Sequence, residues 1–366
     1  MKSDTISIGR GLCIILMVMA HAGSPMWVTR FVYMFHMPFF FIISGYCLKE
    51  FYLSHTRLFL EKRVKGLYIP YIKWSLLFLL LHNVFFHFHF YDTEYGYVAL
   101  SDYSQIPQKI YEVKDLISHG IAALSQMEGH EQLLGGYWFL KELFFGSIIG
   151  FLICKYSLLL GGGGGGKNNL FNSLVAFLLF LSVKGLHIQI PYLNLNWITF
   201  LSTFYYCVGY DLKRLGFSVR SNSVILLMAL VVAAVSLMLP EFEMGKQGSW
   251  YMFLYIGTSV LGFFFVMHVA ATISRTETKM KSFLVACGNH TLSILTWHFI
   301  CFKFVSLSVV ILNHEPLNRI AEFPQIRAYS QEGWWVAYTV VGVIIPLIIS
   351  HYYTNAKNIN SQSTRI

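Results

Sequence analysis

Charged side chains are scarce in this sequence of 366 residues: Asp, Glu, Lys and Arg together account for 12% of it. Soluble domains contain about 25% charged residues, so the chain lacks the groups that would cover a surface facing water on all sides. Hydrophobic residues make up 55% of the chain, and the mean hydropathy is +0.55. Because apolar segments recur from end to end, residues 1–366 are expected to form a single integral membrane domain.

Cysteine and acidic residues are also scarce, and each shortage excludes a class of protein. The six cysteines show neither CxxC pairs nor metal-ligand spacing, and all lie in apolar segments. This pattern predicts buried free thiols, without a disulfide framework or a metal site. Asp and Glu number 18 against 27 Lys and Arg, giving a formal net charge of +9. An excess of basic residues on cytoplasmic loops explains that charge, and no nucleic-acid partner is expected.

Apolar segments near the length that crosses a bilayer, about 20 residues, occur along the whole chain. The fold class is therefore predicted to be all-α, a polytopic transmembrane helix bundle with about ten spans. These are expected at approximately 8–27, 30–48, 67–89, 136–154, 169–186, 195–211, 222–239, 250–273, 284–312 and 333–353.

The first of these segments also has the pattern of a signal peptide, with basic residues, a short apolar run and small residues at positions 20 and 22. Its apolar run continues through 26–28 into the next segment, so a retained first helix is the simpler interpretation.

The basic residues predict how the bundle is oriented. With both termini in the cytoplasm, roughly 17 basic residues lie inside and roughly 7 outside, as the positive-inside rule requires. Residues 91–135 then form a long outer loop, with a short helix expected around Gln108 to Leu124. The inner loop 161–168 contains the run Gly161–Gly166, which is a flexible linker to which no function is assigned.

Two ionisable residues in the first segment are candidates for function, since such groups are costly inside a membrane. Arg10 and His21 are eleven positions apart, close to three helical turns, so they project from one face about 16 Å apart along the axis. The pair places a cation near the inner interface and a titratable base deeper in the membrane. Arg10 alone would also be explained as an interfacial anchor, and His21 as a structural histidine.

The second segment contains FHMPFFFIISGY at residues 35–46. Pro38 is expected to free a backbone carbonyl one turn back and to kink the helix near His36. Ser44 and Gly45 form a small pair that permits close helix approach. Because a short loop joins the first two segments, His36 is expected near His21, either orienting that base or donating a hydrogen bond to the substrate.

These motifs together resemble the opening of the acyltransferase 3-type membrane family, especially its fucose 4-O-acetylase-like sugar O-acetyltransferases. Members of that branch have a basic residue, ten residues and a histidine, followed by an FHMP-type stretch ending in Ser-Gly. Further similar motifs follow in order along most of the chain: Lys62-Arg63 through Pro70-Tyr71, Tyr137-Trp138-Phe139-Leu140, and Gly288-Asn289 through Thr296-Trp297-His298. The sequence departs from the family at Ser7, where many relatives have Asp, and at Gly66, where they often have a second arginine.

The resemblance implies an O-acyltransferase in the inner membrane of the cell. It would move an acetyl group from cytoplasmic acetyl-CoA to a hydroxyl of a cell-envelope sugar or polysaccharide. By this resemblance the catalytic residues are His21, as general base, and His36. The CoA phosphates would be held by basic residues at the inner face: Arg10, Lys62, Arg63 and Lys65. The substrate would contact Ser44, Trp138, Asn289 and His298.

Other polar residues are expected either to have structural roles or to lie on the surface. Lys141 and Glu142 are more simply explained as an internal ion pair than as ligands. His82, His87 and His89 are expected to be surface groups near the outer interface.

Two other functions remain open. A proton-coupled transporter or flippase of glycan or lipid precursors would also need buried His, Lys and Glu, although the sequence shows no clear inverted repeat. A membrane scaffold without catalysis would leave Arg10 and His21 on one helical face without a purpose. Loss of turnover on His21→Ala in a folded protein would distinguish an enzyme from a scaffold.

Overall fold

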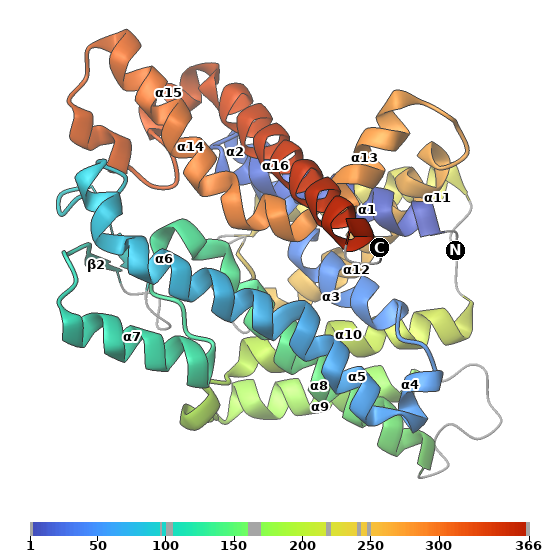
Figure 1. The fold of residues 1–366 in the computed structure, drawn as a ribbon. Coiled ribbons are helices and arrows are strands. Elements are labelled where there is room, and N and C mark those ends of the chain that lie inside the picture. The colour runs from blue at the N-terminus through green and yellow to red at the C-terminus, as the bar shows by residue number, and fades with distance from the viewer. Residues whose placement is uncertain are drawn as a thin grey trace.

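The structure, a computed structural model, describes residues 3–95, 97–99, 105–159, 170–216, 221–239, 243–246 and 250–363. The Gly161–Gly166 run lies outside the described residues. Within them the predicted all-α fold is confirmed (Figure 1), since the strands β1 (Tyr97–Ala99) and β2 (Gln105–Pro107) form only a short antiparallel hairpin.

The first half of the chain forms the helices α1 (Ser3–His21), α2 (Met26–Tyr33), α3 (His36–Tyr46), α4 (Phe51–Ser54), α5 (Thr56–Arg63), α6 (Ile69–His87), α7 (Val113–Gln126) and α8 (Trp138–Leu159). The second half forms α9 (Phe171–Gly185), α10 (Trp197–Leu215), α11 (Asn222–Met238), α12 (Tyr251–Ile273), α13 (Lys279–Asn289), α14 (Thr291–Asn313), α15 (Arg327–Tyr329) and α16 (Trp335–Ser363). Short 3₁₀ segments occur at Gln132–Tyr137, Pro191–Leu193, Met244–Lys246 and Leu317–Ala321, and π segments at Val64–Tyr68 and Ser330–Trp334.

Seven helical segments of the described chain are long and apolar enough to span a membrane: Ser3–His21, Met26–Tyr46, Thr56–His87, Gln132–Ser157, Tyr251–Ile273, Thr291–Asn313 and Arg327–Ser350. The chain is thus a multi-pass membrane protein. The three other predicted spans coincide with α9 and α11, which are shorter apolar helices, and with α10. Nearly all of α10 is buried against other helices, so it needs less apolar surface than a lipid-facing helix. The count of ten and the orientation stay predictions.

The second predicted span is broken rather than kinked. α2 ends at Tyr33 and α3 begins at His36, which places Pro38 in the first turn of α3, where its missing N–H costs no hydrogen bond. The carbonyl that Pro38 leaves free is that of Met34, and it accepts a hydrogen bond from Ser259 Oγ at 2.7 Å. The break therefore anchors His36 at a helix start that α12 holds in place.

Two other predicted spans also differ from the structure. The span predicted at 284–312 is divided at His290, so that α13 ends at Asn289 and α14 begins at Thr291. The span predicted to begin at residue 67 is continuous with α5 through the π segment. π segments often occur at functional sites, and this one directly follows Arg63.

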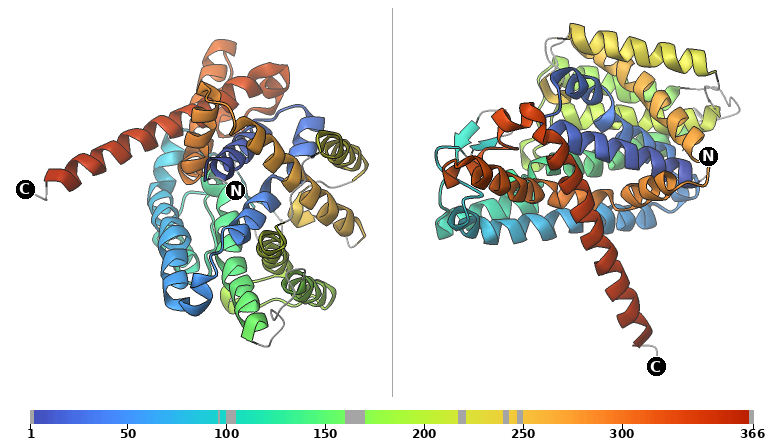
Figure 2. Two further views of the ribbon diagram at one scale, coloured as in Figure 1. Left: turned by 90° about the vertical axis from the view of Figure 1, so that its right-hand side faces the viewer. Right: turned by 90° about the horizontal axis from the view of Figure 1, so that it is seen from above.

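Close backbone contacts at glycines bring the central helices together. α1 packs against α13, α12 and α3, inside the bundle (Figure 2). A Cβ on Gly288 would lie 1.8 Å from the Ser7 carbonyl of α1, and one on Gly45 would lie 1.8 Å from the Tyr206 carbonyl of α10. Gly45 of the Ser-Gly pair therefore makes the close helix approach predicted for it, since no larger residue fits there.

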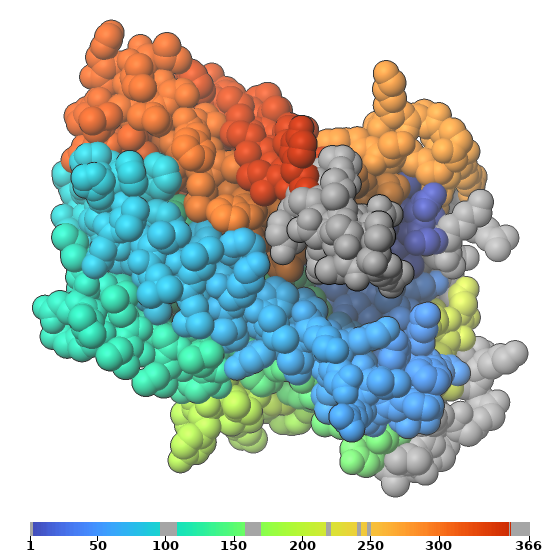
Figure 3. Space-filling model, in the orientation of Figure 1, coloured from blue at the N-terminus to red at the C-terminus, as the bar shows by residue number. Residues whose placement is uncertain are grey.

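The outer parts of the bundle cover this centre. On the face in Figure 3 the light-blue surface of α6 crosses between the teal α7 and the orange α14. The last helix, α16, packs on α14 and then projects away from the body (Figure 2).

Candidate functional site: two cavities beside one histidine pair

The first cavity, here called the cationic cavity, has a volume of about 500 Å³. Its charged lining residues are all basic: Arg10, Lys49, Lys62 and Arg63. No Asp or Glu belongs to the described lining, and apolar residues of α1, α3, α8 and α14 form much of the remaining wall. A cavity of this composition is suited to a long ligand with an anionic head and an apolar arm.

Neutral groups hold the two arginines of the cationic cavity. Arg10 Nη2 donates to Thr291 Oγ1 at 3.1 Å, and Arg63 Nη1 donates to Ser44 Oγ at 3.2 Å. The Arg63 guanidinium also lies 4.9 Å from the centre of the Phe59 ring. Because none of these partners is an acid, the positive charge is left for a ligand.

Three predicted site residues lie in other positions than their assigned roles suggest. Ser44, predicted to contact the substrate, lines the cationic cavity and binds Arg63. Lys65, predicted to contact CoA, is exposed and does not belong to the cavity lining. Asn289, predicted to contact the substrate, lines neither cavity and accepts a hydrogen bond from Ser7 Oγ at 2.9 Å.

The second cavity, here called the polar cavity, has a volume of about 360 Å³. His21, His36 and Trp138 line it, so three of the predicted site residues meet there. Aromatic rings and side-chain amides form part of its wall: Tyr33, Tyr137, Tyr255, Phe323, Gln132, Asn194 and Asn196. Rings with hydrogen-bonding groups between them are suited to a polar ligand with flat apolar faces.

The polar cavity also contains Lys141 and Glu142, for which structural pairing was the simpler interpretation. Both side chains are buried and both line the cavity. The ion pairs of the described residues do not include one between them. Both groups therefore reach the cavity without forming an ion pair within 4 Å of each other.

His21 is joined to a residue far away in the sequence. Its Nδ1 lies 3.1 Å from Nε2 of His298, and the two rings stack at 5.4 Å. His298 is fully buried, and its Nδ1 lies 2.9 Å from the Leu295 carbonyl and 3.1 Å from the Ile294 carbonyl. Since carbonyls only accept hydrogen bonds, Nδ1 of His298 carries its proton and Nε2 accepts one from His21. The remaining nitrogen of His21, Nε2, then has a free lone pair.

His36 occupies a separate position. Its Nδ1 lies 2.9 Å from the carbonyl of Val32, in the last turn of α2, and its ring meets Tyr33 edge-on at 4.9 Å. The hydrogen-bond partner of His21 is thus His298, and His36 does not hold that base in this structure. Nε2 of His36 is the ring nitrogen not engaged with Val32.

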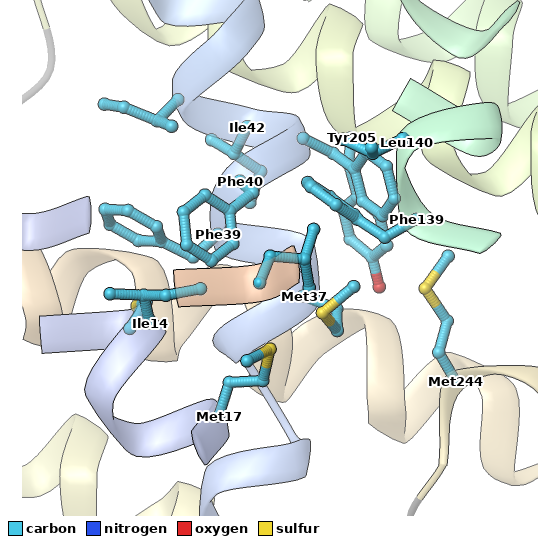
Figure 4. Close-up of a cluster of buried hydrophobic side chains, with 14 of the residues drawn as sticks. Ile14, Met17, Met37, Phe39, Phe40, Ile42, Phe139, Leu140, Tyr205 and Met244 are labelled. Atoms are coloured by element: carbon cyan, nitrogen blue, oxygen red, sulfur yellow. The ribbon is translucent and has the colours of Figure 1, made fainter. Parts of the chain in front are cut away.

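One layer of apolar side chains separates the two cavities. Met17 and Phe40 line the cationic cavity, whereas His21 and Met37, about one turn away on the same helices, line the polar cavity. Figure 4 shows Met17, Met37 and Phe40 gathered with Phe139 of α8. The layer contains Met17 and Met37, and methionine is the most adaptable of the apolar side chains.

Two buried polar contacts were not found from the sequence. His82, expected at the surface, is fully buried; Nδ1 lies 3.1 Å from Glu131, and Nε2 lies 2.9 Å from the Lys109 carbonyl. Lys303 is also fully buried, and its Nζ donates to three consecutive carbonyls, those of residues 320–322. These three residues precede Phe323, so Lys303 holds in place a segment that lines the polar cavity. No local pattern indicates either contact, because each joins residues of different elements.

The outer loop carries a further pair of rings next to the polar cavity. His119 of α7 stacks on His130 at 4.1 Å and meets Tyr111 edge-on. Burial, and then the neighbouring His130, lower the pKa of His119 to about 4. Burial likewise lowers the pKa of His130 and raises that of Tyr111.

The thiols agree with their prediction except at one position. Cys13, Cys154, Cys207, Cys287 and Cys301 are buried and free, whereas Cys47 is exposed. Cys47 lies at the end of α3 and lines the cationic cavity. Within the described residues no group of three or more His, Cys, Asp or Glu side chains is placed to hold a metal ion.

Comparison with known proteins places these features in a family. The model of the acyltransferase 3 family, described as an acyltransferase domain, matches residues 4–351 and so covers both cavities. No curated protein and no solved structure matches the chain.

Proposed function

The chain belongs to the acyltransferase 3 family, and we propose that it transfers an acetyl group from acetyl-CoA to a hydroxyl of a cell-envelope sugar or polysaccharide in the inner membrane. The hydrogen bond between His21 and His298 carries this proposal, because it leaves Nε2 of His21 free as a base on the lining of the polar cavity, one helical turn from Met17 of the cationic cavity. The family supports an acyltransferase; acetyl-CoA, the sugar and the roles of the residues are proposed from the geometry.

In the proposed arrangement the cationic cavity binds the donor. Arg10, Lys62 and Arg63 hold the CoA phosphates, and the apolar wall accommodates the arm that carries the thioester. Under the predicted orientation this cavity opens on the cytoplasmic side, where acetyl-CoA is found. Along α1, Arg10 and His21 are about 16 Å apart, so the arm leads from the phosphates toward the base.

The polar cavity binds the acceptor. Trp138 and Tyr255 offer ring faces to a sugar, and His36 Nε2 and the side-chain amides offer hydrogen-bonding partners. Under the predicted orientation its lining residues lie in the outer half of the bundle. The acyl group would then pass from a cytoplasmic donor, across the layer of Met17 and Met37, to an acceptor at the outer side.

The reaction follows from the protonation of the histidine pair. Nε2 of His21 takes the proton of the acceptor hydroxyl as its oxygen attacks the thioester carbonyl. The carbon–sulfur bond breaks, the thiolate of CoA leaves, and the proton on His21 passes to that thiolate. His298 accepts the Nδ1 proton of His21 in a hydrogen bond throughout, which stabilises the positive imidazolium.

The test of the donor site is the binding of acetyl-CoA to the purified protein in detergent, measured by calorimetry. We expect micromolar affinity for the unchanged chain and about tenfold weaker binding for Arg10→Ala, since a charge-assisted hydrogen bond contributes about 1.5–3 kcal/mol. Absence of binding by folded protein, with or without a sugar present, would contradict the proposal and favour the transporter.

A further inference from the structure

The charged residues that line the polar cavity are mostly acidic, whereas a site for an anionic ligand would be lined by basic residues. Four glutamates belong to its lining, against one basic residue other than histidine, Lys141. No arginine belongs to the described lining. The four glutamates are Glu128, Glu131, Glu142 and Glu243.

Two of these carboxylates already bind polar groups of the protein. Glu131 lies 3.1 Å from Nδ1 of His82 and accepts a hydrogen bond from the Tyr91 hydroxyl at 2.9 Å. Glu243 pairs with Lys246 at 3.2 Å. Neither Glu128 nor Glu142 forms an ion pair within 4 Å among the residues that the structure describes.

The exposed fraction of Glu142 is 4%, and that of Lys141 beside it is 6%. With Glu128 added, Lys141 faces two carboxylates that lack ion-pair partners, so the cavity as a whole has no surplus positive charge. Recognition of a carboxylate or phosphate typically uses arginine forks or several lysines, as the cationic cavity provides with Arg10 and Arg63.

We infer that the sugar unit acylated in the polar cavity carries no carboxylate or phosphate, so that the acceptor is a neutral or amino sugar rather than a uronic, sialic or phosphorylated one. The inference rests on the proposed function. Carboxylates of the lining accept hydrogen bonds from sugar hydroxyls and ammonium groups, whereas an anionic sugar would meet like charge at short range in a partly dry cavity.

A matched pair of small acceptors tests this inference. Methyl galactopyranoside and methyl galacturonopyranoside differ only in a hydroxymethyl group and a carboxylate. Release of CoA thiol from acetyl-CoA is measured with the purified full chain, first with water alone as acceptor and then with each sugar at equal concentration. We expect the neutral sugar to change the rate at least about tenfold more than the acid, equivalent to 1.4 kcal/mol.

Variants that remove one charge each show which glutamates cause the preference for the neutral sugar. Glu142→Gln and Glu128→Gln keep the size of the side chain and remove one negative charge each, so the preference for the neutral sugar is expected to narrow several-fold. Glu94→Gln, at an exposed position outside the lining, is the control and is expected to leave the preference unchanged.

The outcomes separate this inference from the function on which it rests. Equal or greater use of the galacturonoside would overturn the inference, as would no effect of either sugar in a preparation that hydrolyses acetyl-CoA. A preparation that binds no acetyl-CoA and releases no thiol under any condition would instead contradict the proposed acyltransferase reaction.

Discussion

The cationic and polar cavities are neighbours in one bundle and yet differ in almost every chemical respect. The cationic cavity combines four basic side chains with an apolar wall, whereas the polar cavity combines four acids, two histidines on its lining that we assign to catalysis, and aromatic rings. One ligand would not need both a basic and an acidic cavity. Two ligands would, if the donor is anionic and the acceptor is not. The difference favours a two-substrate enzyme over a carrier, in which one substrate would occupy one site from either side.

The largest effect is expected when the proposed base, His21, is removed. His21→Ala removes the group that accepts the hydroxyl proton, so turnover is expected to fall by about 10²–10⁴-fold. Donor affinity is expected to persist, because His21 does not line the cationic cavity. Thiol release and calorimetry on the same preparation measure both quantities. His268→Ala on α12 serves as control; unchanged turnover in His21→Ala would rule out the mechanism.

A smaller loss is expected at the residue that positions the base. His298→Phe removes the acceptor of the Nδ1 proton, so His21 adopts the wrong tautomer part of the time and kcat falls by about 10–100-fold. His298→Gln offers an amide oxygen near the same place and is expected to restore part of kcat. A purely structural role for His298 would instead predict that Phe, the more apolar residue, is tolerated at least as well as Gln.

Two neighbouring basic residues, Arg63 and Lys65, test whether the cationic cavity binds the donor. Arg63→Met is expected to raise the KM for acetyl-CoA about tenfold with little change in kcat, since Arg63 lines the cationic cavity. Lys65→Met, two residues away but exposed and outside the lining, is expected to change neither. If Lys65→Met raises KM as much as Arg63→Met does, the donor phosphates lie outside the cavity described here.

The smallest effect is expected from pH at the outer edge of the polar cavity. The pKa of His119 is about 4 in the folded chain and about 6.5 when exposed, so the exposed state binds more protons between these values. Docking of α7 is therefore fully stable above about pH 6.5 and weakens as the pH falls toward 4. Hydrogen exchange of α7 at pH 5 and 7.5 measures this.

Two variants complete the pH experiment. His119→Gln is expected to flatten the pH dependence, whereas His187→Gln, on an exposed turn, should leave it as in the unchanged chain. An equal pH response in His119→Gln would assign the effect to other groups.

Local sequence was sufficient for much of the site on α1. The apolar run predicts the helix, and 3.6 residues per turn place Arg10 and His21 on one face; the structure puts Arg10 in one cavity and His21 in the other. The Trp-Phe-Leu motif led to Trp138, which lines the polar cavity. The later motif led to His298 only by resemblance, since nothing in its own helix distinguishes it from a buried structural histidine.

The same later motif shows where linear reasoning failed. Asn289 and His298 were assigned one role on one continuous helix, but the break at His290 gives them to α13 and α14. Asn289 binds Ser7, near Arg10, while His298 binds His21. Gly288 and Asn289 directly precede the break and are residues that often end helices, but the apolar run continues on both sides and led to the prediction of one span.

The sequence by itself determined that this protein is a helical membrane protein of the acyltransferase 3 family, because hydropathy, helical period and motif spacing depend on neighbours along the chain. Only the tertiary structure decided that His298, 277 positions away, orients His21, and that Lys303 and His82 hold the segments around the polar cavity. Periodicity shows which residues lie on the same face of one helix. It does not show which other helix packs against that face, since that depends on the packing of all the helices together.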